Sequence, residues 1–116
     1  MPTVLIVDDH AGFRATARAL LAADGFEVVG EAEDGASALD AAGRLDPEVI
    51  LLDVQLPDMD GFAVAGKLTS NGRRYDIVLT SSRDASDFGP LVGCSGARGF
   101  VPKGELSGAA LRAVLH

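Results

Sequence analysis

The sequence predicts a three-layer α/β fold in which helices cover both faces of a parallel β-sheet. Five apolar segments of strand length alternate with five segments of helical pattern along the 116 residues. The segment Val49–Leu52 is apolar without interruption, which is typical of a strand covered on both faces. Helical crossovers favour parallel pairing, so we expect the carboxyl ends of all five strands at one edge of the sheet.

Three strands and two helices are expected in the first half of the chain. Apolar and β-branched runs indicate strands over 3–7, 26–32 and 48–53. A helix is expected from Phe13 to Asp24-Gly25, because glycine is the usual left-handed helix terminator. Its buried face is expected to carry Phe13, Ala17, Leu20 and Leu21. Asp34 is a favourable cap for a second helix over 36–45.

The second half continues the alternation, with one weak element. Pro57 and Gly61 interrupt the pattern after Asp53 and indicate a loop. The expected helices are 62–68 and 105–115, and the expected strands are 76–80 and 97–101. The helix expected over 84–95 contains Gly89-Pro90, and proline inside a helix lacks a donor and clashes with the preceding turn. We therefore expect that helix to be short or broken.

Composition favours one soluble domain and excludes several classes of function. The net charge of −7 argues against direct contact with nucleic acid, because neutralising phosphates needs a basic face. No apolar run has the length of a membrane span, and the start of the chain has no signal-peptide pattern. A single cysteine, Cys94, excludes an internal disulfide, so a cytoplasmic location is expected.

Polar groups of different kinds stand at the ends of four of the five expected strands. They are Asp8 and Asp9, Asp53, the hydroxyls of Thr80 and Ser81, and Lys103. Three carboxylates at one sheet edge would raise one another's pKa unless a cation neutralised them, and oxygen ligands in a shallow site favour Mg²⁺ (or Mn²⁺). Carboxylate, divalent cation, ammonium and hydroxyl are the groups needed to transfer a phosphoryl group onto Asp53.

The order of these groups, with the motif Leu56-Pro57-Asp58-Met59-Asp60-Gly61, resembles the receiver domain of bacterial two-component response regulators. The segment 96–103 resembles the NarL/FixJ-like (LuxR-type) branch of that family. The resemblance covers residues 1–116 and implies a flavodoxin-like, CheY-like (βα)5 sandwich with strand order 2-1-3-4-5. Members of that branch are usually fused to a helix-turn-helix output domain, which would lie outside this chain.

The resemblance also implies roles for individual residues. Asp53 would accept a phosphoryl group from a sensor histidine kinase, and Lys103 would pair with the phosphoryl oxygens. Mg²⁺ would be held by Asp9 directly, by Asp8 mainly through water, by Asp53 and by the main-chain carbonyl of Gln55. Phe100 would be a switch aromatic, and Gln55 and Arg83 would tune the rate of dephosphorylation. The regulated surface would be the fourth helix, fifth strand and fifth helix, with a homodimer possible there or through the first and fifth helices.

Two hydroxyls compete for one role in the expected site. The family's usual spacing back from Lys103 points to Ser81, whereas the local pattern of the strand points to Thr80. Neighbouring strand residues face opposite sides, so only one of the two can serve. We favour Ser81, because the choice of Thr80 requires an insertion, and we keep Thr80 as the alternative.

Simpler interpretations of the same residues remain open. Asp8 or Asp9 could cap the first helix, and Lys103 could be an ordinary solvated lysine. Asp58 and Asp60 are best interpreted as solubilising loop residues and a cap for the helix over 62–68, and His10 as an exposed neighbour of the site. The expected function is a switch that phosphorylates and dephosphorylates itself and is not a turnover enzyme. The alternatives are a phosphorylation-independent scaffold of the same fold and, less favoured, a phosphatase with an aspartate nucleophile.

Overall fold

Five parallel strands form the central layer of the protein. The computed structural model describes residues 2–70, 72, 74–83 and 85–115. The strands are β1 (Thr3–Val7), β2 (Glu27–Ala32), β3 (Val49–Asp53), β4 (Asp76–Ser81) and β5 (Gly99–Pro102). They pair in the order β2-β1-β3-β4-β5, and every pairing is parallel. The predicted three-layer fold and strand order 2-1-3-4-5 are confirmed.

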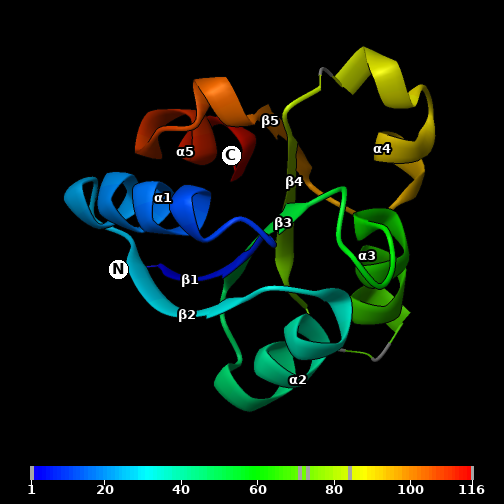
Figure 1. Ribbon diagram of the computed structural model, residues 1–116, viewed down its shortest axis with the longest axis horizontal. Coiled ribbons are helices and arrows are strands. Elements are labelled where there is room, and N and C mark those ends of the chain that lie inside the picture. Colours follow the sequence, from blue (N-terminus) through cyan, green and yellow to red (C-terminus); the bar gives the residue numbers. More distant parts are fainter. Residues whose placement is uncertain (1, 71, 73, 84, 116) are drawn as a thin grey trace.

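Helices cover both faces of this sheet (Figure 1). The α-helices are α1 (Ala11–Ala23), α2 (Gly35–Leu45), α3 (Gly61–Ser70), α4 (Leu91–Cys94) and α5 (Gly108–Leu115), and 3₁₀ turns cover Ala85–Phe88 and Lys103–Glu105. Helices α1 and α5 pack on one face, and α2 and α3 pack on the other. Among the described residues, no helix has both the length and the apolar character needed to cross a bilayer.

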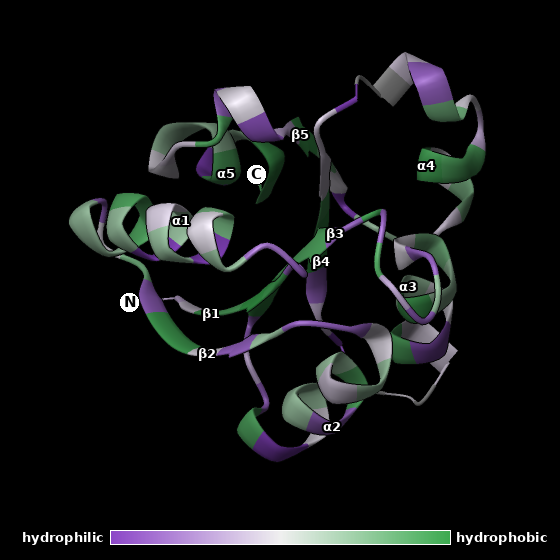
Figure 2. Ribbon diagram, in the orientation of Figure 1, coloured by the Kyte–Doolittle hydropathy of each residue, from purple (hydrophilic) through white to green (hydrophobic). Residues whose placement is uncertain are grey.

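The alternation of side chains along the strands explains the uninterrupted apolar runs. On β1, Leu5 and Val7 point toward α2 and α3, whereas Val4 and Ile6 point toward α1 and α5. All four are buried, and the same holds for residues 49–52 of β3. In Figure 2 β1 is coloured as hydrophobic, whereas the helices alternate between hydrophobic and hydrophilic residues. A strand covered on both faces has no polar side, as the sequence predicted.

Local signals predicted the C-terminal end of α1 and the N-cap of α2 correctly. Helix α1 ends at its C-cap Asp24, and the following Gly25 has a φ of 90°, a conformation that favours glycine. Asp34 caps α2: its side chain accepts a hydrogen bond from the main-chain N–H of Ser37 at 2.8 Å. These caps satisfy backbone groups that have no partner inside the helix.

Helices α1 and α5 differ from the predictions in three details. Helix α1 begins at Ala11, two residues before Phe13, and Leu20 is 38% exposed because it lies at the margin of the buried stripe formed by Ala17 and Leu21. Helix α5 begins at Gly108 rather than at Glu105. Leu106 is extended, and the Ser107 hydroxyl accepts a hydrogen bond from the N–H of Ala110, so the helix starts after this cap.

The segment around Gly89-Pro90 is broken, as predicted. Residues 85–88 form a 3₁₀ turn, and Gly89 follows with a φ of 58°. Helix α4 then has only four residues, none of them buried, and Leu91 is 52% exposed. The physical reason is the one expected from the sequence, because Pro90 cannot donate into a preceding helical turn.

Candidate functional site

The parallel sheet brings the predicted site residues to one edge. Asp8 directly follows β1, Asp53 is the last residue of β3, and Lys103 directly follows β5. Asp8 is 0% and Asp53 is 3% exposed, so two carboxylates are buried at the carboxyl ends of neighbouring strands. This convergence is the arrangement expected where open α/β sheets bind ligands.

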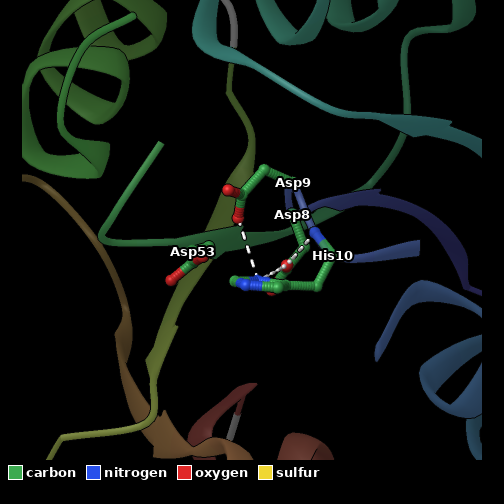
Figure 3. A group of neighbouring side chains, drawn as sticks. All are labelled: Asp8, Asp9, His10 and Asp53. Carbon is green, nitrogen blue, oxygen red and sulfur yellow. Dashed lines mark hydrogen bonds and ion pairs between the residues drawn. The ribbon is translucent and has the colours of Figure 1, made fainter. Parts of the chain in front are cut away.

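Four side chains at this edge could hold a metal ion (Figure 3). One ligand atom from each of Asp8, Asp9, His10 and Asp53 lies within 4.8 Å of the others. The His10 Nδ1 atom is 3.1 Å from an oxygen of Asp8 and 3.0 Å from an oxygen of Asp9. The predicted exposed position of His10 beside the site is confirmed, but its contact with both acids was not predicted. The oxygen-rich donor set suits a hard divalent cation.

Asp8 and Asp9 are not the N-cap of α1. The N-cap is His10, whose side chain makes no capping hydrogen bond. The Asp8 carboxylate instead accepts a hydrogen bond from the main-chain N–H of His10 at 2.8 Å, and Asp9 keeps a side chain that is 36% exposed. The pair therefore belongs to the acidic cluster rather than to the helix terminus.

Lys103 neutralises the buried acids and is not an ordinary solvated lysine. Its Nζ atom is 2.6 Å from an oxygen of Asp8 and 3.4 Å from an oxygen of Asp53, and its side chain is 17% exposed. The ammonium also lies 4.6 Å from the centroid of the Phe13 ring, a cation–π contact. The sequence assigned Phe13 to the core alone, and no local pattern could have predicted this second contact.

Burial and repulsion oppose ionisation of Asp53. The pKa of Asp53 is raised above its ordinary value, first by removal of the carboxylate from water and then by the charge of Asp8. The N–H of Gln55, which donates to the Asp53 carboxylate at 3.2 Å, and the ammonium of Lys103 offset part of this rise. A further cation among the acids would favour the charged carboxylate.

The loop after β3 packs tightly against the backbone of Asp53. The N–H of Gly61 donates to the carbonyl of Val54 at 2.6 Å, and a Cβ atom on Gly61 would collide with the carbonyl oxygen of Asp53. Only glycine fits this approach. Asp60 accepts a hydrogen bond from the N–H of Ala63 at 2.7 Å, so its predicted role as the cap of the following helix is confirmed.

Asp58 has a structural role that the sequence did not predict. Its carboxylate accepts hydrogen bonds from the N–H groups of Gly35 at 2.7 Å and Ala36 at 2.9 Å, at the start of α2. These bonds lower the pKa of Asp58. Asp58 is an exposed loop residue, as expected, but it does not cap the helix that follows it: its bonds link the loop after β3 to α2, which precedes it.

The two candidate hydroxyls occupy different positions at the end of β4. Thr80 is the register partner of Asp53 and therefore shares its face of the sheet, and its buried hydroxyl has no hydrogen-bond partner among the described residues. Ser81 is the last residue of the strand, pairs in register with Pro102 beside Lys103, and accepts a hydrogen bond from the N–H of Arg83 at 3.1 Å. Among the described residues, neither hydroxyl forms a hydrogen bond with Asp53, so the choice stays a prediction.

The remaining predicted residues lie around this edge. Phe100 is half-buried on β5, and its ring centroid is 5.9 Å from that of Phe88. Phe88 contacts Phe62 of α3 at 5.6 Å, so a row of three rings connects β5 to α3 through the 3₁₀ turn. Gln55 and Arg83 are both exposed. Their predicted tuning roles, and that of Phe100 as a switch, stay predictions.

Comparison with known proteins agrees with this geometry. Residues 4–115 match the response regulator receiver domain family. The chain is 45% identical over 102 residues to the nitrate/nitrite response regulator protein NarP of Escherichia coli, covering 86% of this chain and 47% of that protein. It is 37% identical over 102 residues to the transcription regulator BvgA of Bordetella pertussis, covering 88% of this chain and 49% of the relative. The chain thus spans about half the length of these curated relatives.

Solved structures show the same relationship. The signal receiver domain of the response regulator NarL from Mycobacterium tuberculosis superimposes with a TM-score of 0.87 at 34% identity, over 98% of this chain and 96% of that one. A LuxR-family response regulator from Aurantimonas shares the fold, with a TM-score of 0.88 at 24% identity over 99% of this chain and 86% of the other. The chain belongs to the response regulator receiver domain family, and it is similar in sequence to NarP and to the NarL receiver domain.

Proposed function

We propose that this chain is a phosphorylation-dependent switch in which Asp53 accepts a phosphoryl group from a sensor histidine kinase. The observation that carries the proposal is the convergence of Asp53, the acidic pair and Lys103 at one sheet edge. A buried nucleophilic carboxylate, a possible cation site and a fixed ammonium are the groups that stabilise a transferring phosphoryl group.

The proposed reaction uses Asp53 as the nucleophile. A carboxylate oxygen bonds to phosphorus while the phosphorus–nitrogen bond of a phosphohistidine breaks, and the departing imidazole keeps the electron pair and takes a proton from solvent. Asp53 must be charged to attack, yet its raised pKa opposes the charged form. Lys103, 3.4 Å away, holds a positive charge where charge on the phosphoryl oxygens would develop.

The acidic cluster fits the Mg²⁺ ion that this chemistry implies. Asp8, Asp9 and Asp53 offer carboxylate oxygens within 4.8 Å of one another, and the proposal adds the main-chain carbonyl of Gln55. A bound divalent cation would supply charge neutralisation for the carboxylates and for a phosphate oxygen. Mn²⁺ prefers similar oxygen ligands and could take the same place.

The proposed switch starts at Lys103, which now lies closer to Asp8 than to Asp53. A new phosphoryl charge on Asp53 would shift this balance and draw Lys103 and a hydroxyl of β4 inward. Thr80 shares the sheet face of Asp53 and neighbouring strand residues face opposite sides, so we propose Thr80 for this hydroxyl, in place of the Ser81 that the spacing favoured. Phe100 and the short α4 would follow, changing the surface formed by α4, β5 and α5.

The proposed output is regulation of transcription by a domain outside this chain. Relatives such as NarP and BvgA carry the names of response and transcription regulators, and this chain spans about half of their length. Some relatives are named protein-glutamate methylesterases, of which it spans 31% or less, so a receiver can also accompany an enzyme. We propose that residues 1–116 act as a cytoplasmic receiver without turnover activity and without direct contact to nucleic acid.

Incubation with Mg²⁺ and acetyl phosphate tests the proposal. Intact-mass spectrometry should show a gain of one phosphate that is absent in Asp53→Asn and retained in Asp40→Asn, which changes an exposed acid of α2. Steady release of phosphate without an adduct would support the phosphatase. No reaction with acetyl phosphate or with a histidine kinase would support the scaffold.

We also propose that phosphorylation promotes a homodimer, formed either through α4–β5–α5 or through α1 and α5. Size-exclusion chromatography with and without beryllofluoride, which mimics the phosphoryl group, measures it. Earlier elution in beryllofluoride and Mg²⁺ is expected, and identical elution in both conditions would contradict dimerisation on phosphorylation.

A further inference from the structure

The main chain of Asp8 is anchored by a side chain from α1. The N–H of Asp8 donates to the carbonyl of Ala32 at 3.0 Å, which extends the pairing of β1 with β2 by one bond. The carbonyl of Asp8 lies beyond the last residue of β1 and instead accepts a hydrogen bond from Arg14 Nη1 at 2.5 Å. The Arg14 side chain is only 16% exposed.

Arg14 is itself held in place from β2. Its Nε atom donates to one carboxylate oxygen of Glu31 at 3.0 Å, and the other oxygen accepts from Arg18 Nε at 2.8 Å. Hydrogen bonds from Arg18 and then Arg14 lower the pKa of Glu31, which keeps this carboxylate charged. A planar guanidinium that bonds two acceptors at once has little freedom to turn, so the Asp8 carbonyl meets a fixed donor.

The orientation of this carbonyl matters to the acidic cluster, because it belongs to the peptide that joins Asp8 to Asp9. We propose that Arg14 is a positioning residue for the cation site, acting through the Asp8 carbonyl to direct both carboxylates toward the same point. This inference rests on the proposed function, because it assumes that the cluster binds Mg²⁺. It assigns a role to the Arg14–Glu31 pair that motif and comparison leave unassigned.

Electrostatics and positioning predict opposite results when Arg14 is removed. A guanidinium close to an acidic cluster repels a cation, so loss of its charge alone should strengthen Mg²⁺ binding. Loss of positioning should weaken it, and removing the partners that orient metal ligands typically costs about 10- to 100-fold in metal affinity. Arg14 bonds the main-chain carbonyl of Asp8 and not a ligand carboxylate itself. We therefore expect a loss of Mg²⁺ affinity at the lower end of this range, about tenfold.

Two variants and a matched control test the proposal. Arg14→Gln removes the donor and the charge, and Arg14→Lys keeps the charge but loses the planar fork. Arg18→Gln is the control, since it removes an equal charge and a hydrogen bond to the other carboxylate oxygen of Glu31, and Arg18 has no hydrogen bond to Asp8 among the described residues. The Mg²⁺ affinity is measured by calorimetric titration, and the rate of Asp53 phosphorylation by acetyl phosphate is measured as a function of Mg²⁺ concentration.

Arg14→Gln should raise both the Mg²⁺ dissociation constant and the half-saturating Mg²⁺ concentration about tenfold, with a maximal rate close to that of the wild type. The Mg²⁺ dissociation constant of Arg14→Lys should lie between those of the wild type and Arg14→Gln. That of Arg18→Gln should stay within about twofold of the wild type, because exposed charges are screened. An Arg14→Gln variant that binds Mg²⁺ as tightly as Arg18→Gln would overturn the inference. If Arg14→Gln does not fold, unchanged affinity in Arg14→Lys would overturn it equally.

The same data separate this inference from the proposed function. A wild-type protein that neither binds Mg²⁺ nor accepts a phosphoryl group would overturn the proposed function, and the inference with it. A wild-type protein that does both, beside an Arg14→Gln variant with unaltered affinity, would overturn the inference alone.

Discussion

Replacing Lys103 by methionine removes the cation that neutralises two buried carboxylates. In the metal-free protein at pH 7, we expect Lys103→Met to lower the free energy of unfolding by about 3 kcal/mol. Methionine fills a similar volume and is apolar, so the loss reports charge more than packing.

The magnitude follows from the geometry. At an effective dielectric constant of about 20, the ion pairs of 2.6 Å with Asp8 and 3.4 Å with Asp53 correspond to gross attractions of about 6 and about 5 kcal/mol. The desolvation of an ammonium that is only 17% exposed offsets several kcal/mol of this sum. Breaking a buried ion pair costs about 3–5 kcal/mol, and the lower end applies where water reaches one partner.

The loss should depend on pH with a definite sign. Lys103 is one of the groups that lower the pKa of Asp53, so its removal raises that pKa further. A carboxyl whose pKa is higher in the folded than in the unfolded state destabilises the protein above the folded pKa, and this penalty fades as the pH falls through that value. The difference between Lys103→Met and the wild type should therefore be larger at pH 7 than at about pH 5.

Urea denaturation at both pH values, without and with Mg²⁺, measures this effect. Lys67→Met is the control, because Lys67 is the other lysine of the chain and is exposed on α3. It should change the free energy of unfolding by no more than about 0.5 kcal/mol. Mg²⁺ should restore part of the stability of Lys103→Met. Equal stability of Lys103→Met and Lys67→Met, or a deficit that grows as the pH falls, would refute the electrostatic account.

Three further changes test other parts of the structure. Asp58→Ala should lower the thermal midpoint of unfolding at pH 7, as measured by calorimetry at several pH values. The difference from the wild type should shrink as the pH falls below 3.8, the ordinary pKa of aspartate, because the bonds that lower the pKa of Asp58 stabilise only its charged form. Gly61→Ala should lower the free energy of unfolding in urea by about 2 kcal/mol, since its Cβ would meet the Asp53 carbonyl. The control Gly66→Ala, with open space around its Cβ position, should raise it by about 0.5 kcal/mol, and equal effects at the two glycines would contradict the steric argument. Thr80→Val should raise the free energy of unfolding by about 1 kcal/mol by removing a buried hydroxyl without a partner among the described residues; a loss in the same urea titration would show that this hydroxyl is bonded.

Short-range patterns predicted the architecture well because they report on burial and caps within a few residues. The apolar run of β3 and the cap at Asp34 are signals of this kind, and so is the break at Gly89-Pro90. Where tertiary contacts or caps compete with the apolar pattern, the observed helix boundaries and buried faces differ from the predicted ones. The Ser107 cap delays the start of α5, and Leu20 lies outside the buried stripe of α1.

The residues of the site divide in the same way. Asp8, Asp53 and Lys103 stand at strand ends, and parallel pairing alone brings strand ends together, so their convergence follows from the order of elements. The partners of these residues come from other elements of the fold, either the next one along the chain or a distant one. Arg14 bonds the Asp8 carbonyl, Phe13 lies under the ammonium of Lys103, and Asp58 caps α2, and no spacing in the chain encodes these contacts.

The amino-acid sequence alone therefore establishes the layers, the strand order through the family resemblance, and the set of charged groups at one edge. The periodicity of apolar residues and the positions of strand ends are local properties of the sequence, and they do not depend on small shifts in helix packing. Only the three-dimensional structure shows that Lys103 is closer to Asp8 than to Asp53, that His10 contacts both acids, and that Arg14 holds the Asp8 peptide. These contacts depend on ångström-scale packing between elements, and side-chain packing is a property of the folded chain as a whole.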